Sequence, residues 1–174
     1  INSITKSKAF EFIFPNQVYL DAKLRHLMSD AYESLQAFIV FKKSQKDTFR
    51  QQLYLKTALT DLKLENLAEK QLFRIKKYQE KKTIKDANYF LQNYELEQEI
   101  FVIKAKQQRT EATNLQEITA TFSTFFVINT LKYACKSQTH SILRKAAYKI
   151  PLLDAVLEEV KKGTYNSIDT VMQY

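Results

Sequence analysis

Glycine and proline are almost missing from this sequence. Its 174 residues include one Gly and two Pro, which are the residues on which hairpins and tight β-turns depend. A β-sandwich or barrel of this length needs many such turns, whereas helices joined by short connections need few. The hydrophobic content of 45% and the charged content of 26% are typical of a folded globular chain. The composition therefore predicts an all-α protein.

Apolar residues recur at helical spacing along the chain. In the first long segment they step by four and three, which places them on one face of a helix over residues 20–43: Leu20, Leu24, Leu27, Ala31, Leu35 and Phe38. The same periodicity predicts helices over residues 47–62, 64–82, 83–106, 114–137 and 151–162. The segment FEFIFPNQ before the first of these is expected to form an extended arm or a short helix. The tail SIDTVMQY reads as the opening turns of another helix.

Capping signals mark several of these helix ends. Thr83 with Asp86, and Asn114 with Glu117, resemble capping boxes that open the fourth and fifth helices. Pro151 is placed as a first helical residue of the sixth helix, and Gly163 comes just past its end. Residues 118–128 are rich in β-branched and aromatic side chains and leave a strand possible. The length of the segment and its cap favour a helix.

The middle helices are apolar on two sides. In the fourth, Phe90 and Tyr94 lie on one face and Leu96 and Ile100 on another, so this helix needs a neighbour on each side. We expect antiparallel helix pairs, stacked as a short α-α superhelix or a bundle of about six or seven helices. Residues 1–174 are interpreted as a single domain, and the unfinished tail favours a fragment of a longer helical array. A short frayed terminal helix is the alternative.

The charge and the cysteine content bear on the partners and the location. The net charge is +8, which allows an anionic partner. Cys135 is the only cysteine, so a disulfide scaffold is excluded. The first residues lack the pattern of a signal peptide, and no apolar run is long enough to span a bilayer. The sequence predicts a cytoplasmic protein without membrane insertion.

Three stretches carry a resemblance to known proteins: YLDAKLRHLMSDAYE, DANYFLQNYELEQE and LKYACKSQT. With them, the chain resembles across its whole length a group of uncharacterised all-helical bacterial proteins of helical-repeat type. The resemblance implies a longer helical-repeat chain in a bacterial cytoplasm. It implies no activity, cofactor or catalytic residue.

The residue types used in catalysis form no convincing set. Cys135 and His140 are five positions apart and diverge on a helix, and Cys135 is expected to be buried on an apolar face. His26 has no nearby second metal ligand. Glu95, Glu97 and Glu99 are interpreted as an exposed acidic face that a basic neighbour can match. We therefore expect no catalytic residue, no metal site, no cofactor and no small-molecule substrate.

The clearest positive signal is a row of basic residues. They step by four, three, four and four, and up to the end of the third helix they share one face, opposite Leu72 and Ile75: Lys70, Arg74, Lys77, Lys81 and Lys85. Such a row suits a phosphate backbone, although a solvated helix face is the simpler interpretation. Lys outnumbers Arg here, while specific readers of nucleic acids favour Arg.

These observations lead to two hypotheses of different classes. The first is a non-catalytic helical scaffold for protein–protein interaction within a larger protein, because stacked helices form grooves and the ten Tyr and twelve Phe suit interfaces. The second is binding of nucleic acid or another polyanion through the basic row.

Overall fold

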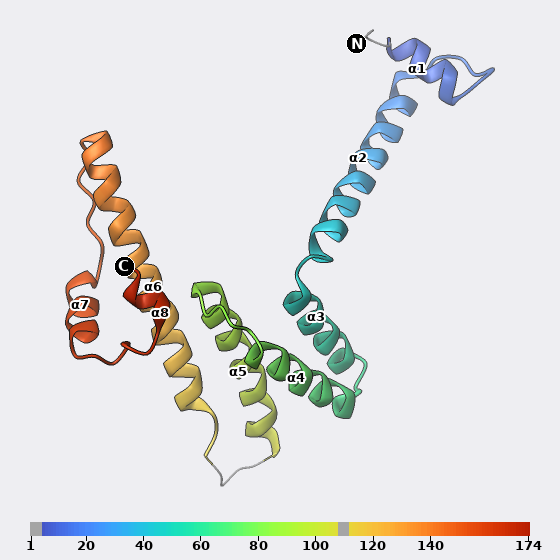
Figure 1. The fold of residues 1–174 in the computed structure, drawn as a ribbon. Helices are drawn as coiled ribbons and strands as arrows, with labels where there is room; N and C mark the ends of the chain where they lie inside the picture. Colours follow the sequence, from blue (N-terminus) through green and yellow to red (C-terminus); the bar gives the residue numbers. More distant parts are fainter. Residues whose placement is uncertain (1–4, 108–111) are drawn as a thin grey trace. The chain divides into compact units, whose positions relative to one another are not determined.

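Helices make up all the regular secondary structure in residues 5–107 and 112–174, which the computed structural model describes. Eight helices follow one another along this part of the chain (Figure 1): α1 (Lys6–Ile13), α2 (Asp21–Ser44), α3 (Thr48–Asp61), α4 (Glu65–Glu80), α5 (Ala87–Gln107), α6 (Leu115–Arg144), α7 (Leu153–Lys161) and α8 (Asp169–Met172). The all-α prediction is confirmed. The helix count exceeds the expected one because the segment before Pro15 forms α1 and the tail forms α8.

The segment that left a strand possible, residues 118–128, lies inside α6. This helix also runs past its predicted end at residue 137 and reaches Arg144. No Gly or Pro interrupts residues 138–144, so nothing in the chain stops the helix earlier. Lys145, with a left-handed φ of 49°, follows its last residue. Helix ends in this chain are thus made largely without glycine.

Three predicted helix starts differ from the observed ones. Thr83 lies outside α5, and the Asp86 carboxylate caps that helix by accepting a 2.8 Å hydrogen bond from the Tyr89 backbone amide. Asn114 occupies the N-cap position of α6, but its side chain makes no cap bond. Pro151 does not open α7, because the helix begins at Leu153 after a left-handed Leu152, φ 62°. Gly163, φ 85°, follows the end of α7 as expected.

Contacts divide the chain into two compact units, one up to Gln51 and one from Gln52 to Tyr174. In the first unit, Phe10 of α1 is buried, and its ring centroid lies 5.0 Å from that of Phe14 and 5.3 Å from that of Tyr19. This aromatic cluster holds the chain between α1 and α2. The interpretation of residues 1–174 as one domain stays a prediction.

The inward face predicted for α2 is wrong over most of its length. Leu24 is buried, but Leu35 is 53% exposed and Phe38 is 54% exposed. The reason is the size of its neighbour in the first unit. With 8 residues against 24, α1 can cover only one end of α2, so the remaining apolar side chains have no helix of this unit over them.

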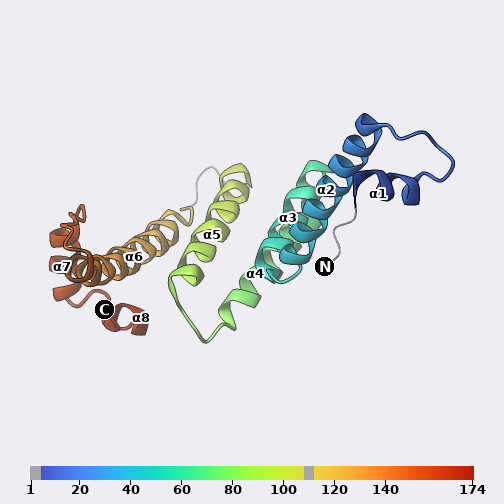
Figure 2. The ribbon, with the colours of Figure 1, turned by 90° about the horizontal axis from the view of Figure 1, so that it is seen from above.

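In the second unit, α5 packs between α4 and α6, and α6 also contacts α7 and α8 (Figure 2). The core around α6 combines side chains from α6, α7 and α8: Val127, Ile128, Leu131, Val156 and Val171. The α4 residues Leu72 and Ile75 are buried too, as predicted. The expectation that the helices now labelled α5 and α6 need neighbours on two sides is confirmed.

Candidate interaction surfaces

The basic row begins on α4 and continues beyond it. Lys70, Arg74 and Lys77 lie on the helix, Lys81 follows its last residue, and Lys85 lies in the connection to α5. All five side chains are exposed. Leu72 and Ile75, on the opposite face of α4, are buried, so the predicted division of this helix into a basic and an apolar face is observed.

Most of these cations have no acidic partner. Lys70, Arg74 and Lys81 form no hydrogen bond or ion pair with the residues that the structure describes. Lys77 lies over the ring of Phe73, with its Nζ 4.7 Å from the centroid, and Lys85 lies in the same way 6.0 Å from the centroid of Tyr89. A cation over an aromatic face keeps its charge available on the side away from the ring. The row is therefore open to an anionic partner.

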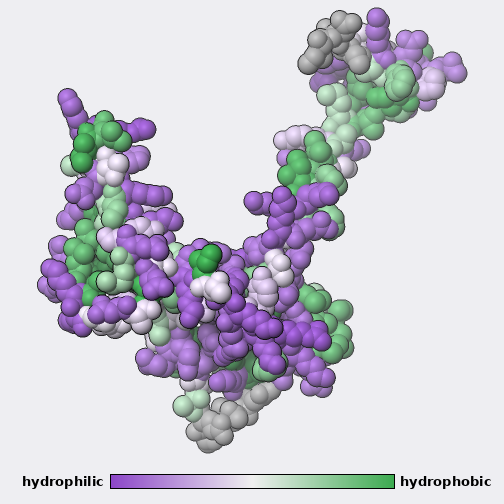
Figure 3. Space-filling model, viewed as in Figure 1, coloured by the Kyte–Doolittle hydropathy of each residue, from purple (hydrophilic) through white to green (hydrophobic). Residues whose placement is uncertain are grey.

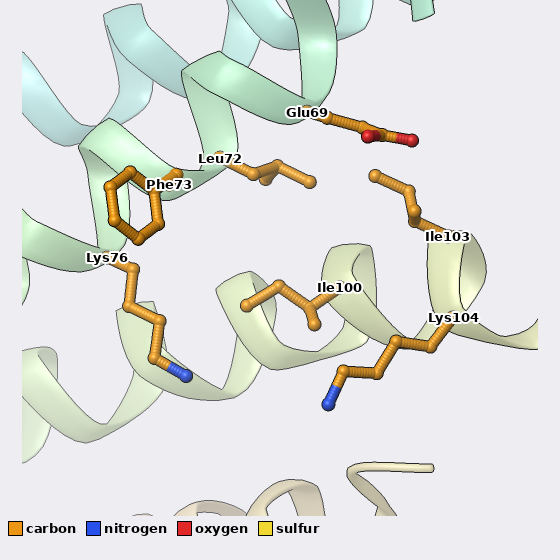
Figure 4. Close-up of a pocket in the computed structure, with 7 residues that line it drawn as sticks. All are labelled: Glu69, Leu72, Phe73, Lys76, Ile100, Ile103 and Lys104. Atoms are coloured by element: carbon orange, nitrogen blue, oxygen red, sulfur yellow. The ribbon is translucent and has the colours of Figure 1, made fainter. Parts of the chain in front are cut away.

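A groove of about 270 Å³ lies beside this row, between α4 and α5. Figure 4 shows Leu72 of α4 facing Ile100 and Ile103 of α5 across it. Polar and charged groups surround these aliphatic side chains, and the complete lining is Glu69, Leu72, Phe73, Lys76, Ile100, Ile103 and Lys104. The ammonium groups of Lys76 and Lys104 lie toward one side of the groove and the Glu69 carboxylate toward the other (Figure 4).

Phe73 joins the groove to the basic row. Its side chain lines the groove, yet it is 61% exposed, and the Lys77 ammonium lies over its ring. Helical spacing predicted that the basic residues share one face up to the end of this helix, but it did not predict the groove. Its two walls come from helices whose side chains meet only after folding, and spacing along one helix carries no such information.

The glutamates of α5 hold helices together instead of forming an exposed acidic face. Glu97 is buried: its Oε1 lies 3.2 Å from the Lys76 ammonium, and its Oε2 accepts a 2.7 Å bond from the Asn114 amide. Glu99 is half-buried and pairs with the buried Lys56 of α3. Burial of a carboxylate requires such partners. The expected match to basic neighbours is observed, but the expected exposure is wrong for Glu97.

Cys135 is exposed, so its predicted burial is wrong. It lines a cavity of about 380 Å³ with α7 and Tyr148, and its Sγ lies 3.9 Å from the Tyr174 carbonyl. The cavity leaves the Cys135 side chain accessible. His26 and His140 are both exposed. Within residues 5–107 and 112–174, no group of three His, Cys, Asp or Glu side chains is placed to hold a metal ion.

The uncovered residues of α2 form a second surface, which we name the α2 row. Its members share one helical face and are all more than half exposed: Met28, Tyr32, Leu35, Phe38 and Ile39. Hydrophobic side chains are visible along this helix (Figure 3). Single exposed apolar residues are normal on a protein surface, whereas a continuous row of five is not.

Comparisons with known proteins found no matching family model, no matching curated protein and no matching solved structure. The resemblance to a bacterial helical-repeat family stays a prediction. None of the helices in the described part of the chain combines the length and the apolar character that crossing a bilayer requires.

Proposed function

We propose that this protein is a non-catalytic helical scaffold for protein–protein interaction. The observation that carries the proposal is the α2 row, in which Met28, Leu35 and Phe38 repeat at spacings of seven and three and stay exposed. An amphipathic helix with apolar residues at such spacings binds in the groove of a partner protein. Burying one large apolar side chain contributes about 1.5–3 kcal/mol, so these three supply a substantial part of the free energy that must offset the entropy cost of association.

The test is quantitative capture with the full chain as bait, followed by cross-linking and mass spectrometry. Leu35→Glu and Phe38→Glu place a charge in the row, and each should reduce the capture of a partner at least about tenfold, a loss of about 1.4 kcal/mol. Gln36→Glu is the matched control, because Gln36 is exposed on the same helix but lies off the row. Circular dichroism checks that the variants stay helical.

Two results would count against the scaffold. One is capture that neither row variant changes relative to Gln36→Glu. The other is a set of cross-links from α2 that join it only to residues of its own chain, because the row would then be covered without a partner.

A second function, binding of a polyanion such as nucleic acid, is favoured by a separate observation. Lys70, Arg74 and Lys81 are exposed and unpaired among the described residues. Binding through them should weaken steeply with salt, because each neutralised phosphate releases counterions. In a gel-shift titration, the double variant Arg74→Glu with Lys77→Glu should lose binding. Lys42→Glu with Lys43→Glu removes the same charge from α2 and should retain most of it. No shift at low salt contradicts this function.

A further inference from the structure

The groove between α4 and α5 combines an aliphatic interior with a basic edge. We propose that it binds a short acidic segment of a partner protein, which inserts one large apolar side chain between Leu72, Ile100 and Ile103 and places carboxylates against Lys104 and Lys77. This inference rests on the proposed protein-interaction function, but it uses a different surface from the α2 row.

The size of the groove favours a single side chain as its occupant. Its volume of about 270 Å³ is below the roughly 300–1,000 Å³ of sites that enclose a whole small molecule. Leu72 is buried at its base, while Ile100 and Ile103 are half-buried and can still lose exposed area to an inserted group. An apolar anchor of a peptide gains most of its binding energy from such a partly desolvated site.

The charges of the groove select an acidic segment. The charge of Lys76 is already matched by Glu97, at 3.2 Å, whereas Lys104 has no ion pair among the described residues. Lys77 lies 4.7 Å from the ring of Phe73, which lines the groove, so a second cation lies at its edge. Arg74 and Lys70 continue the positive charge along α4. A peptide with its carboxylates on the lysine side of the anchor meets these cations and avoids the Glu69 carboxylate on the other side of the groove.

The same features disfavour a nucleic acid in this groove. Single-stranded nucleic acids stack successive bases on several aromatic rings, whereas Phe73 is the single aromatic side chain in this lining and the interior is built from Leu72, Ile100 and Ile103. The cations in the lining are Lys76 and Lys104, which act as point charges, and the planar donor pairs that Arg offers to phosphate are absent from it. A carboxylate forms a strong charge-assisted hydrogen bond with a single lysine ammonium.

The experiment uses fluorescence anisotropy with the full chain and an array of short labelled peptides. All peptides carry Asp and Glu, and they differ in one central residue: Leu, Ile, Met, Phe or Ala. A parallel set replaces the acids with Lys, and a labelled oligothymidylate tests the nucleic-acid alternative. We expect binding only for acidic peptides with a large apolar centre, and at least about a tenfold loss with Ala at that position, which corresponds to about 1.4 kcal/mol.

Two pairs of variants locate the binding. Ile103→Asp and Lys104→Glu should each weaken the peptide complex about tenfold or more. Val102→Asp and Lys106→Glu make the same chemical changes at exposed neighbouring positions of α5 outside the groove lining, and should leave it within about twofold. Circular dichroism identifies a variant that fails to fold, and Ile103→Ala then replaces Ile103→Asp as the milder change.

The inference is wrong if acidic peptides with and without the anchor bind equally, or if the groove variants behave like their controls. Tighter binding of the oligothymidylate than of every peptide would assign the surface to nucleic acid instead. The α2 variants Leu35→Glu and Phe38→Glu should not change peptide binding. Loss of partner capture through α2 with intact peptide binding, or the reverse, therefore separates a failure of the scaffold from a failure of this inference.

Discussion

Three polar side chains meet the Asp21 carboxylate at the start of α2. Oδ1 accepts a 3.0 Å bond from the Tyr19 hydroxyl and lies 3.8 Å from the Lys6 ammonium, and Oδ2 pairs with Arg25 one turn further along the helix. The hydrogen bond from Tyr19, followed by that from Arg25, lowers the pKa of Asp21 below its ordinary value. Asp21 also lies in the first turn, where the helix dipole favours a negative charge.

Removing the strongest of these contacts should be visible in a titration. Tyr19→Phe deletes the hydroxyl, so the pKa of Asp21 should rise toward its ordinary value, as followed by carboxyl NMR shifts. Because the pKa is lower in the folded chain than in the unfolded one, Asp21 stabilises the fold above its unfolded pKa, and this contribution disappears as the pH falls through the folded pKa. Tyr32→Phe, on the exposed α2 row, is the control. An unchanged pKa in Tyr19→Phe would contradict this account.

The exposure of Cys135 leads to a second prediction for a single residue. Because the side chain is accessible in the folded chain, a maleimide should label it without denaturant, at a rate within about tenfold of that in the unfolded chain. Cys135→Ser should take up no label. Protection of the thiol until the chain unfolds would show that the residue is buried after all, as its apolar sequence neighbours suggested.

At the scale of elements, Asn114 links the start of α6 to the middle of α5. Its side-chain amide donates to the Glu97 backbone carbonyl at 2.8 Å and to the Glu97 carboxylate at 2.7 Å. Both residues are buried, so water cannot replace these bonds. Asn114 was predicted to cap α6, but its side chain instead joins α6 to α5 by hydrogen bonds.

Substitutions at Asn114 distinguish the two roles. Asn114→Ala should lower the free energy of unfolding by about 1–3 kcal/mol, because a buried carboxylate and a carbonyl lose their donor. Asn114→Asp would preserve a helix cap, but it removes the donor and places a second carboxylate beside Glu97. It should therefore destabilise the chain at least as much in urea unfolding at neutral pH. A nearly neutral Asp variant would instead show that the position acts as a cap.

At the scale of the molecule, the C-terminal turn completes the core of the second unit. Val171 of α8 is buried against the α6 residues of this core, and the neighbouring Thr170 hydroxyl donates to the Lys85 carbonyl at 2.7 Å. Residues far apart in the sequence are thus brought together around the end of α8. Although α8 is only four residues long, it contributes Val171 to the core.

Val171→Ala should lower the free energy of unfolding by about 2 kcal/mol through the lost apolar contacts and the space left behind. Met172→Ala, an exposed neighbour in the same turn, should change it by less than about 0.5 kcal/mol. Hydrogen exchange at Ile128 and Leu131 reports on the same core and should become faster only in the Val171 variant. Equal effects of the two substitutions would mean that α8 does not contribute to the core.

The sequence predicted burial and exposure correctly where the pattern of a single helix determines them. In α4, alternation of apolar and basic residues at helical spacing correctly divided Leu72 and Ile75 from Lys70 and Arg74. It was less informative where the answer depends on which helix lies opposite. The apolar periodicity of α2 is real, yet periodicity cannot say whether a neighbour covers the face.

The same distinction holds for the candidate sites. The basic row depends on spacing along one helix, and it was predicted from the sequence. The groove depends on Leu72 meeting Ile100 and Ile103, and the burial of Glu97 depends on Lys76 and Asn114, which lie on other elements. These contacts join residues far apart in the sequence, and periodicity along one helix does not predict them.

The left-handed residues at the helix ends have a further consequence for heat tolerance. Lys63, Lys145 and Leu152 adopt φ values of 58°, 49° and 62°, a conformation that strains an ordinary side chain by roughly 1–2 kcal/mol and leaves glycine relaxed. Glycine at these three junctions should therefore relieve backbone strain, a gain that is partly offset by the greater conformational entropy of the unfolded chain. The net effect should be a higher melting temperature with the helices unchanged, at the cost of three exposed side chains.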